Sequence, residues 1–345
     1  MSSTGEKYKI VLVLMAICLL GASPAFALTA DPMDLGVGAR SLGLGGAYVA
    51  VAEDAEALFI NPAGLGAISS LKLGSMYSNL FDNPDYTGLS YTAISGAYPM
   101  DNESGTLGAG FISRYTGQIE LYDSSGSFVD NATYGSSVLF VSHGLDLSRK
   151  YFPDMKKLYG GYTLKYFMMS ATGTGTSGLN GYGLALDAGL LYKPKGFISY
   201  GLALQNILAS TMVYQDGVED TIGSAAKVGT KVSVMGDAMD GGSIYQSDSR
   251  LDVALDCDMG IGYKIPSTLH LGLEYKPKIG VNYVDDVLTL RAGLNQVPAP
   301  EGSLNNITAG VGINYQGMEF NYAYTPSYGD IPETATHFFS ISYIG

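Results

Sequence analysis

Residues 181–193 read GYGLALDAGLLYK, and their side chains alternate in character with a period of two, as in a β-strand. One face is apolar and has a tyrosine at each end: Tyr182, Leu184, Leu186, Ala188, Leu190 and Tyr192. In a tilted strand these two tyrosines would lie roughly 23 Å apart along the membrane normal, close to the apolar band of about 25 Å between the aromatic girdles of membrane barrels. The stretch therefore predicts a strand that crosses a membrane. A cysteine at Leu186 should be shielded by lipid, and one at Asp187 should face the lumen.

The same alternation recurs along most of the chain and predicts about fourteen strands. They are 71–78, 87–98, 106–116, 133–145, 157–169, 181–193, 197–207, 225–235, 249–261, 267–276, 287–295, 304–315, 317–325 and 336–344. A soluble β-sandwich would also alternate, but its outer face would carry many charges, and charged residues are only 15% of this chain. We therefore expect an all-β fold, a transmembrane antiparallel β-barrel formed by residues 71–345.

The N-terminus has the pattern of a secretory signal peptide over residues 1–27. Lys7 and Lys9 precede an apolar run at 10–20, and Ala25-Phe26-Ala27 provides a cleavage site. The run is too short for a membrane helix, which needs about 20 residues. The formal charge of −13 argues against a nucleic-acid partner. Cys257 would be the sole cysteine of the mature chain, so no intrachain disulfide is expected.

Residues 28–70 fit neither a spanning strand nor a long helix. They are glycine-rich at 36–46, acidic at 53–56, and then read Asn61-Pro62-Ala63-Gly64. A barrel of about fourteen strands has room for a small insert. We predict that this segment is an N-terminal plug, or hatch, inside the barrel.

Two blocks of this segment carry a resemblance to known proteins. The blocks are DLGVGARSLGLGGAYVAVAED at 34–54 and ALFINPAGL at 57–65, followed by GLALQNI at 201–207 and FNYAY at 320–324. They resemble the PorV/PorQ family and the wider FadL-type outer-membrane transport proteins. The resemblance implies a fourteen-stranded barrel with Asn61, Pro62 and Ala63 in a luminal hatch. It also implies passage of hydrophobic compounds in FadL-type members and a part in type IX protein secretion in PorV-type members. The chain departs from the usual terminal aromatic residue by ending in Ile344-Gly345, with Tyr343 as its substitute.

The candidate site residues lie in the plug. Pro62 and Gly64 form a stiff bend followed by a flexible one, so Asn61, Pro62, Ala63 and Gly64 form the plug motif. Their apolar neighbours would line the route of a hydrophobic ligand or, alternatively, only pack the plug against the wall: Leu58, Phe59, Ile60 and Leu65. Arg40 should anchor the plug by pairing with an acidic group. Charges expected on the inner face should pair with one another and hold the plug: Arg114, Lys165, Asp187, Lys227, Lys231, Asp252, Asp256, Asp258, Glu274, Arg291 and Glu319.

Motifs that would indicate other chemistry are weak. The G-x-G-x-x-G at 173–178 precedes a strand rather than the helix that dinucleotide binding requires. His143, His270 and His337 lie on three different strands without a nucleophile motif or metal-ligand spacing. Asp237, Asp240 and Asp248 miss the spacing of a calcium loop. We therefore expect no enzyme activity, catalytic residue, cofactor or metal.

These observations lead to one function and one alternative. The expected function is an outer-membrane channel for hydrophobic or amphipathic small molecules, such as long-chain fatty acids, gated by the plug. The alternative is a PorV-like structural or sorting component of a type IX secretion system. Expected partners are outer-membrane lipid, a hydrophobic ligand, the outer-membrane assembly machinery and, for the alternative, secretion-system proteins. The expected location is the outer membrane of a Gram-negative-type cell.

Overall fold

The structure is a computed structural model. It describes residues 35–80, 89–101, 103–155, 157–173, 180–215, 217, 219–237, 242–261, 267–279, 287–299, 302–326 and 335–345. The predicted signal peptide at 1–27, most of the glycine motif at 173–178 and Asp240 lie outside these residues.

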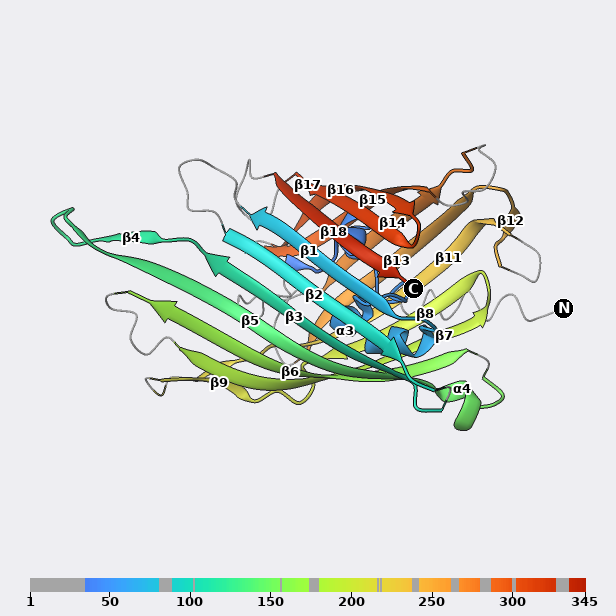
Figure 1. The fold of residues 1–345 in the computed structure, drawn as a ribbon, viewed down its shortest axis with the longest axis horizontal. Helices are drawn as coiled ribbons and strands as arrows, with labels where there is room; N and C mark the ends of the chain where they lie inside the picture. The colour runs from blue at the N-terminus through green and yellow to red at the C-terminus, as the bar shows by residue number, and fades with distance from the viewer. Residues whose placement is uncertain are drawn as a thin grey trace.

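Fourteen long antiparallel strands form a closed barrel, as predicted (Figure 1). They are β1 (Lys72–Leu80), β2 (Leu89–Pro99), β3 (Thr106–Thr116), β5 (Phe128–Asp146), β6 (Leu158–Thr172), β7 (Gly181–Lys195), β8 (Ile198–Gln205), β11 (Ser224–Gly236), β13 (Arg250–Ile261), β14 (Thr268–Lys276), β15 (Leu288–Ala299), β16 (Gly302–Tyr315), β17 (Met318–Thr325) and β18 (Thr336–Ile344). β1 pairs with β18 from Lys72↔Ile344 to Asn79↔His337, which closes the sheet.

Four short strands extend the connections at one end of the barrel or the other. β4 (Ile119–Tyr122) forms a hairpin with β5 that projects beyond the barrel (Figure 1). β9 (Thr211–Tyr214) pairs with β10 (Glu219–Thr221), and β12 (Tyr245–Gln246) pairs with β11. The helix α4 (Leu147–Lys150) and the C-terminus lie at the opposite end from the β4–β5 hairpin. No helix among the described residues is long and apolar enough to cross a membrane.

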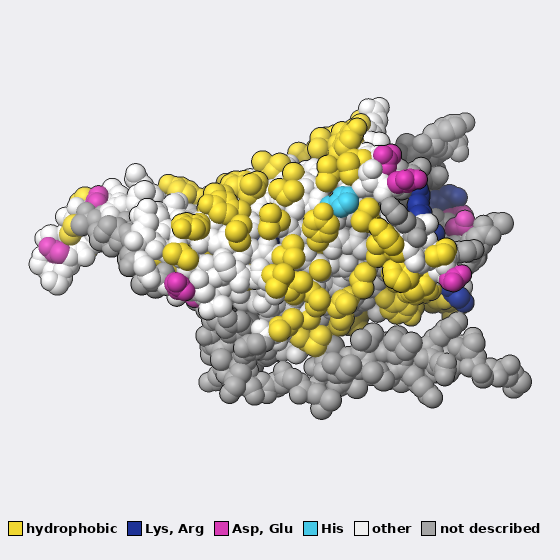
Figure 2. All heavy atoms as spheres, turned by 90° about the horizontal axis from the view of Figure 1, so that it is seen from below, with side chains coloured by type: hydrophobic (Ala, Val, Ile, Leu, Met, Phe, Trp, Pro, Cys, Tyr) yellow, Lys and Arg dark blue, Asp and Glu magenta, His cyan; other side chains and the backbone are white. Residues whose placement is uncertain are grey.

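The two faces of β7 have the character that the alternation predicts. Tyr182, Leu184 and Leu190 are 58%, 48% and 43% exposed on the outside. Apolar side chains gather in the same way on the face seen in Figure 2, and many outward side chains of the other strands are exposed and apolar. Asp187 points inward, but it is only 1% exposed and its Oδ2 lies 2.8 Å from Nζ of Lys165. The expectation that a cysteine at this position faces open lumen was therefore wrong, because the inner wall is covered here.

The segment that covers the inner wall is formed by residues 35–70. It contains the short helices α2 (Ala39–Gly43), α3 (Ala57–Ile60) and the 3₁₀ helix η2 (Pro62–Ala67), which lie within the ring of strands (Figure 1). Glycines on the inner face allow its backbone to approach closely. A Cβ at Gly161, Gly201 or Gly293 would lie 2.2–2.4 Å from backbone atoms of this segment. We call residues 35–70 the inner segment.

Candidate functional site: an inner segment held by ion pairs

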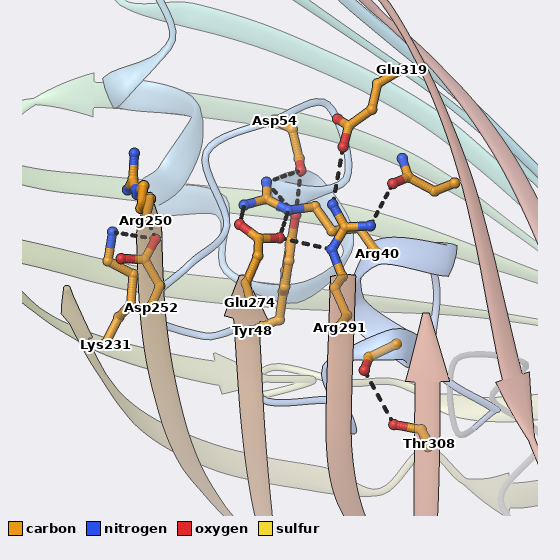
Figure 3. Close-up of polar contacts among 12 residues, drawn as sticks. Arg40, Tyr48, Asp54, Lys231, Arg250, Asp252, Glu274, Arg291, Thr308 and Glu319 are labelled. Carbon is orange, nitrogen blue, oxygen red and sulfur yellow. Dashed lines mark hydrogen bonds and ion pairs between the residues drawn. The ribbon is translucent and has the colours of Figure 1, made fainter. Parts of the chain in front are cut away.

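Arg40 of α2 points at the wall and joins the inner segment to β14 (Figure 3). Its Nε and Nη2 donate to the two carboxylate oxygens of Glu274, each at 3.0 Å. Nη1 lies 3.3 Å from Oδ2 of Asp54 and donates to the Tyr48 hydroxyl at 3.2 Å. Burial alone would lower the pKa of Arg40, but the attraction of Glu274, Tyr48 and Asp54 outweighs it and raises this pKa well above its ordinary range. The guanidinium is therefore permanently charged and bound in a two-pronged ion pair.

A second arginine shares the same carboxylate. Arg291 of β15, whose side chain is fully buried, donates from Nε to Oε2 of Glu274 at 2.8 Å. Its Nη2 lies 3.0 Å from Glu319, and its Nη1 donates to the side-chain oxygen of Asn321 at 2.6 Å. Glu274 thus bridges one arginine of the inner segment and one of the wall.

Glu56 is buried next to this network without a hydrogen bond to its Oε2 among the described residues. Burial and the neighbouring Asp54 raise its pKa from an ordinary value of 4.5 to about 8. The carboxyl lies against Gly38, which has a φ of 87° and whose added Cβ would be 1.9 Å from Oε2. Only glycine therefore suits position 38, and Glu56 is protonated when the segment is docked at neutral pH.

The backbone of residues 43–49 is bound by polar groups of three wall strands. Asp256 of β13 accepts from the amides of Tyr48 and Val49 at 2.5 and 2.7 Å. Nδ1 of His270 lies 3.0 Å from the carbonyl oxygen of Gly45, and the Thr308 hydroxyl donates to Gly43 O at 3.3 Å (Figure 3). The contacts of His270 and Thr308 were not predicted. Their inward position on the alternating strands was the available signal.

Two more pairs of the charges expected on the inner face lie opposite one another. Lys227 lies 2.5 Å from Asp258, and Lys231 lies at a longer distance of 3.9 Å from Asp252. Arg250, which was not among the predicted residues, also pairs with Asp252, at 2.9 Å. It lies at the start of β13, where the alternating pattern begins.

The four residues of the proposed plug motif lie together against β6 and β7. The Asn61 amide donates to the carbonyl oxygens of Val49 and Leu190 at 2.8 and 3.2 Å, and its Oδ1 accepts from Ala63 N at 3.2 Å. This contact caps the 3₁₀ helix that begins at Pro62. An added Cβ at Gly64 would lie 1.9 Å from the carbonyl oxygen of Ala52. All four residues are buried, so the motif joins two parts of the inner segment to the wall.

The apolar neighbours of the motif are packed in this conformation. Leu58, Phe59 and Leu65 are at most 1% exposed, and Ile60 is partly exposed. The ring of Phe59 lies edge-on to Phe140 of β5 with 4.9 Å between centroids. They contact the wall rather than an open passage, so their role in lining a ligand route stays a prediction that requires the segment to move.

The inner face of the barrel is chemically divided. On β1–β7 its buried side chains are mainly apolar: Met76, Leu80, Tyr91, Ala93, Ile112, Val138, Phe140, Phe167, Met169 and Ala185. The buried charged groups described on these strands are Lys165 and Asp187. On β11–β17 the inner face carries Asp256 and Glu274, which bind the inner segment, and Lys193 near the end of β7 also pairs with Glu53. Met212 and Ile222 continue the apolar cluster toward the end that carries β9 and β10.

In the described part of the chain, no group of histidine, cysteine, aspartate and glutamate side chains could hold a metal ion. Asp248, at one of the proposed loop positions, instead pairs with Lys278 at 3.0 Å. Cys257 of β13 is a buried, reduced cysteine.

Comparison with known proteins shows likeness in structure rather than in sequence. No family model matches the chain, and the search of curated proteins finds no match. Among solved structures, the toluene transporter TbuX of Ralstonia pickettii aligns with a TM-score of 0.55 at 12% identity, over 90% of this chain and 98% of that one. The CymD monoaromatic hydrocarbon channel gives 0.57 at 13%, over 90% and 97%, and the P. putida toluene transporter TodX gives 0.54 at 12%, over 90% and 99%. Closed antiparallel barrels with an apolar outer surface span outer membranes. This chain has the fold of these three proteins and is such an outer-membrane barrel.

Proposed function

We propose that this protein is an outer-membrane channel for hydrophobic or amphipathic small molecules and that the inner segment gates it. The observation that carries the proposal is the apolar inner face of β1–β7. A water-filled porin has a polar interior, because the side chains that line its channel are in contact with water. Inward-facing Ile112, Val138, Phe167 and Met169 would bind water poorly and an apolar molecule well.

The inner segment supplies the gate of the proposed channel. Its contacts with β11–β17 include the ion pair of Arg40 with Glu274. Its contacts with β3–β7 are apolar or through the Asn61 motif, together with the Thr163 hydrogen bond to Leu58 and an ion pair between Glu53 and Lys193 of β7. A rearrangement near Phe59 would open the apolar side while Arg40 keeps the segment bound to Glu274. Leu58, Phe59, Ile60 and Leu65 then line the route.

The three solved structures support this class of cargo, since each is named for toluene or for monoaromatic hydrocarbons. The resemblance of the N-terminal blocks to FadL-type proteins extends the class to long-chain fatty acids. Export by a signal peptide cleaved after Ala27, followed by insertion by the outer-membrane assembly machinery, completes the proposal.

The PorV-like alternative is favoured by a different observation. The β4–β5 hairpin projects from the barrel and exposes apolar side chains that a protein partner could cover: Ile119, Tyr122, Phe128 and Val129 at 42%, 58%, 55% and 47%. Such a patch suits docking of a secretion-system protein.

Ligand binding by the purified barrel tests the two functions. Folded protein in detergent is titrated with oleate, toluene and sucrose by calorimetry, and uptake into proteoliposomes is followed for the same compounds. We expect binding and uptake of oleate or toluene and none of sucrose. If the folded barrel takes up no acyl or aromatic compound, the channel function is wrong and the secretion component is preferred.

A further inference from the structure

A polar cavity lies where the inner segment meets β11, β13 and β14. Its volume is about 220 Å³. The inner segment contributes Arg40, Leu44, Val51 and Glu53, and the wall contributes Lys231, Arg250, Asp252, Ala254, Gly272, Glu274 and Lys276. Both sides of this seam are needed to form the cavity.

The cavity lies toward one end of the barrel. Arg250 begins β13 and pairs in register with Lys276, which ends β14. That end also carries the C-terminus and α4 (Figure 1). In barrels with an even number of strands both chain ends face the periplasm, so the cavity lies on the periplasmic side.

The charges around the cavity are unbalanced in favour of cations. Four basic and three acidic side chains line it, in a chain whose formal charge is −13. Arg250 and Lys231 face the same oxygen of Asp252: Nε of Arg250 lies 2.9 Å from Oδ2, and Nζ of Lys231 lies 3.9 Å from it (Figure 3). The longer distance exceeds that of a hydrogen bond. Lys231, with 13% of its side chain exposed, is thus a largely buried cation, and the nearer oxygen of its neighbouring carboxylate is already bound by Arg250. Oδ1 of Asp252 has no hydrogen-bond partner among the described residues.

We propose that this cavity binds a small oxyanion, a carboxylate or a phosphate, presented from the periplasmic side. The oxyanion would accept hydrogen bonds from Lys231 and from the Arg250 guanidinium, whose Nε is the atom used in the contact with Asp252. A buried cation without a full partner is costly, and an anion at this place removes that cost.

Binding of the anion is coupled to the position of the inner segment. Because Arg40 and Glu53 form one side of the cavity, the complete site exists only while the segment is docked. A ligand that binds the docked state stabilises that state by linkage. The oxyanion is therefore a periplasmic effector that favours the docked position of the inner segment.

Titration of the full-length protein in detergent with inorganic phosphate, and separately with acetate, tests the site. We expect one bound phosphate or acetate per chain and a loss of affinity of at least tenfold in Lys231→Met, which keeps most of the aliphatic side chain. Lys278→Met is the matched control, since it removes the same charge at the same end of the barrel outside the cavity. We expect it to bind as the wild type does. Arg250→Gln, at the half-exposed rim, gives a second variant if Lys231→Met does not fold.

Hydrogen exchange of residues 44–53 tests the coupling, and lipid composition distinguishes the sources of the anion. Phosphate should slow exchange in the wild type and not in Lys231→Met. In nanodiscs, phosphatidylglycerol that blocks phosphate binding would identify a lipid head group as the ligand, and unchanged binding would identify a free anion. Absence of binding for both probes, equal loss in the Lys231 and Lys278 variants, or binding without slower exchange would overturn the proposal. None of these measurements depends on the cargo, so the result is independent of the channel function.

Discussion

Arg40 and Glu274, 234 residues apart in the chain, form a two-pronged ion pair between the inner segment and β14, with both nitrogen–oxygen distances at 3.0 Å. Glu274 simultaneously accepts from Arg291 of the wall at 2.8 Å. Arg291 also lies 3.0 Å from Glu319, so without Arg40 a single arginine would face two carboxylates. Removal of Arg40 therefore leaves buried negative charge only partly compensated.

Replacing Arg40 should loosen the inner segment. Arg40→Ala removes the contacts with Glu274, Asp54 and Tyr48, and we expect docking to weaken by about 3 kcal/mol. Small-solute leakage through proteoliposomes or conductance in a planar bilayer should rise. Arg149→Ala, which breaks the exposed pair with Asp146 outside the barrel lumen, is the control and should leave both unchanged. Equal leakage in wild type and Arg40→Ala would show that Arg40 does not hold the segment.

A methyl group at Gly161 should displace the plug motif. Its Cβ would lie 2.3 Å from the carbonyl oxygen of Pro62 and 2.7 Å from the amide nitrogen of Ala63, so backbone must shift. We expect Gly161→Ala to leave a folded barrel with faster hydrogen exchange over residues 57–67. Gly96→Ala is the matched control, because its Cβ would lie 3.3 Å from the flexible Leu73 side chain and 4.0 Å from the nearest backbone atom. The close contact at η2 is refuted if exchange in Gly161→Ala equals that of the control.

Docking of the inner segment should weaken as pH rises. Burial, with Asp54, raises the pKa of Glu56 from 4.5 to about 8 in the docked state. Glu56 of the released segment therefore loses a proton that Glu56 of the docked segment keeps. The free energy of docking becomes progressively less favourable between about pH 4.5 and pH 8. Below this window Glu56 is protonated in both states, and its pKa shift does not weaken docking. Above the window the whole penalty from this pKa shift weakens docking.

Glu56→Gln tests this dependence, since the amide is neutral at every pH. Leakage of the wild type should increase from pH 5 to pH 9, and that of Glu56→Gln should change much less. Glu103→Gln, a change at an exposed glutamate outside the inner segment, serves as the control for lost charge. A pH profile that is the same in wild type and Glu56→Gln would assign the effect to another group.

Phe59→Asp should weaken binding of an acyl-chain ligand if the route passes the inner segment. An ionised carboxylate in the packed contact with Phe140 would be costly, and it would make the predicted route unfavourable for an apolar chain. Phe59→Leu keeps an apolar side chain and should bind oleate within about threefold of the wild type. Calorimetry on the folded barrel decides whether Phe59 lines the ligand route or only packs the segment against the wall. A loss of stability with unchanged oleate affinity would show that it only packs the segment.

The sequence by itself determined the barrel and the faces of its strands. Alternation is a local property of residues two apart, so the pattern at 181–193 and its repeats predicted all fourteen long strands. The same reasoning placed Asp256, Glu274 and Arg291 on the inner face. It also indicated that Arg40 needs an acidic partner, because an enclosed charge requires one.

Only the tertiary structure decided which of these groups meet. The contacts of Arg40 with Glu274 and of His270 with Gly45 join residues more than 200 positions apart, and they depend on how the closed sheet places each strand around the inner segment. Closure also divided the lumen into an apolar and a charged side, covered Asp187, and formed the cavity at Lys231. Such pairings follow from the closed three-dimensional packing of all strands at once, which no local spacing in the chain expresses.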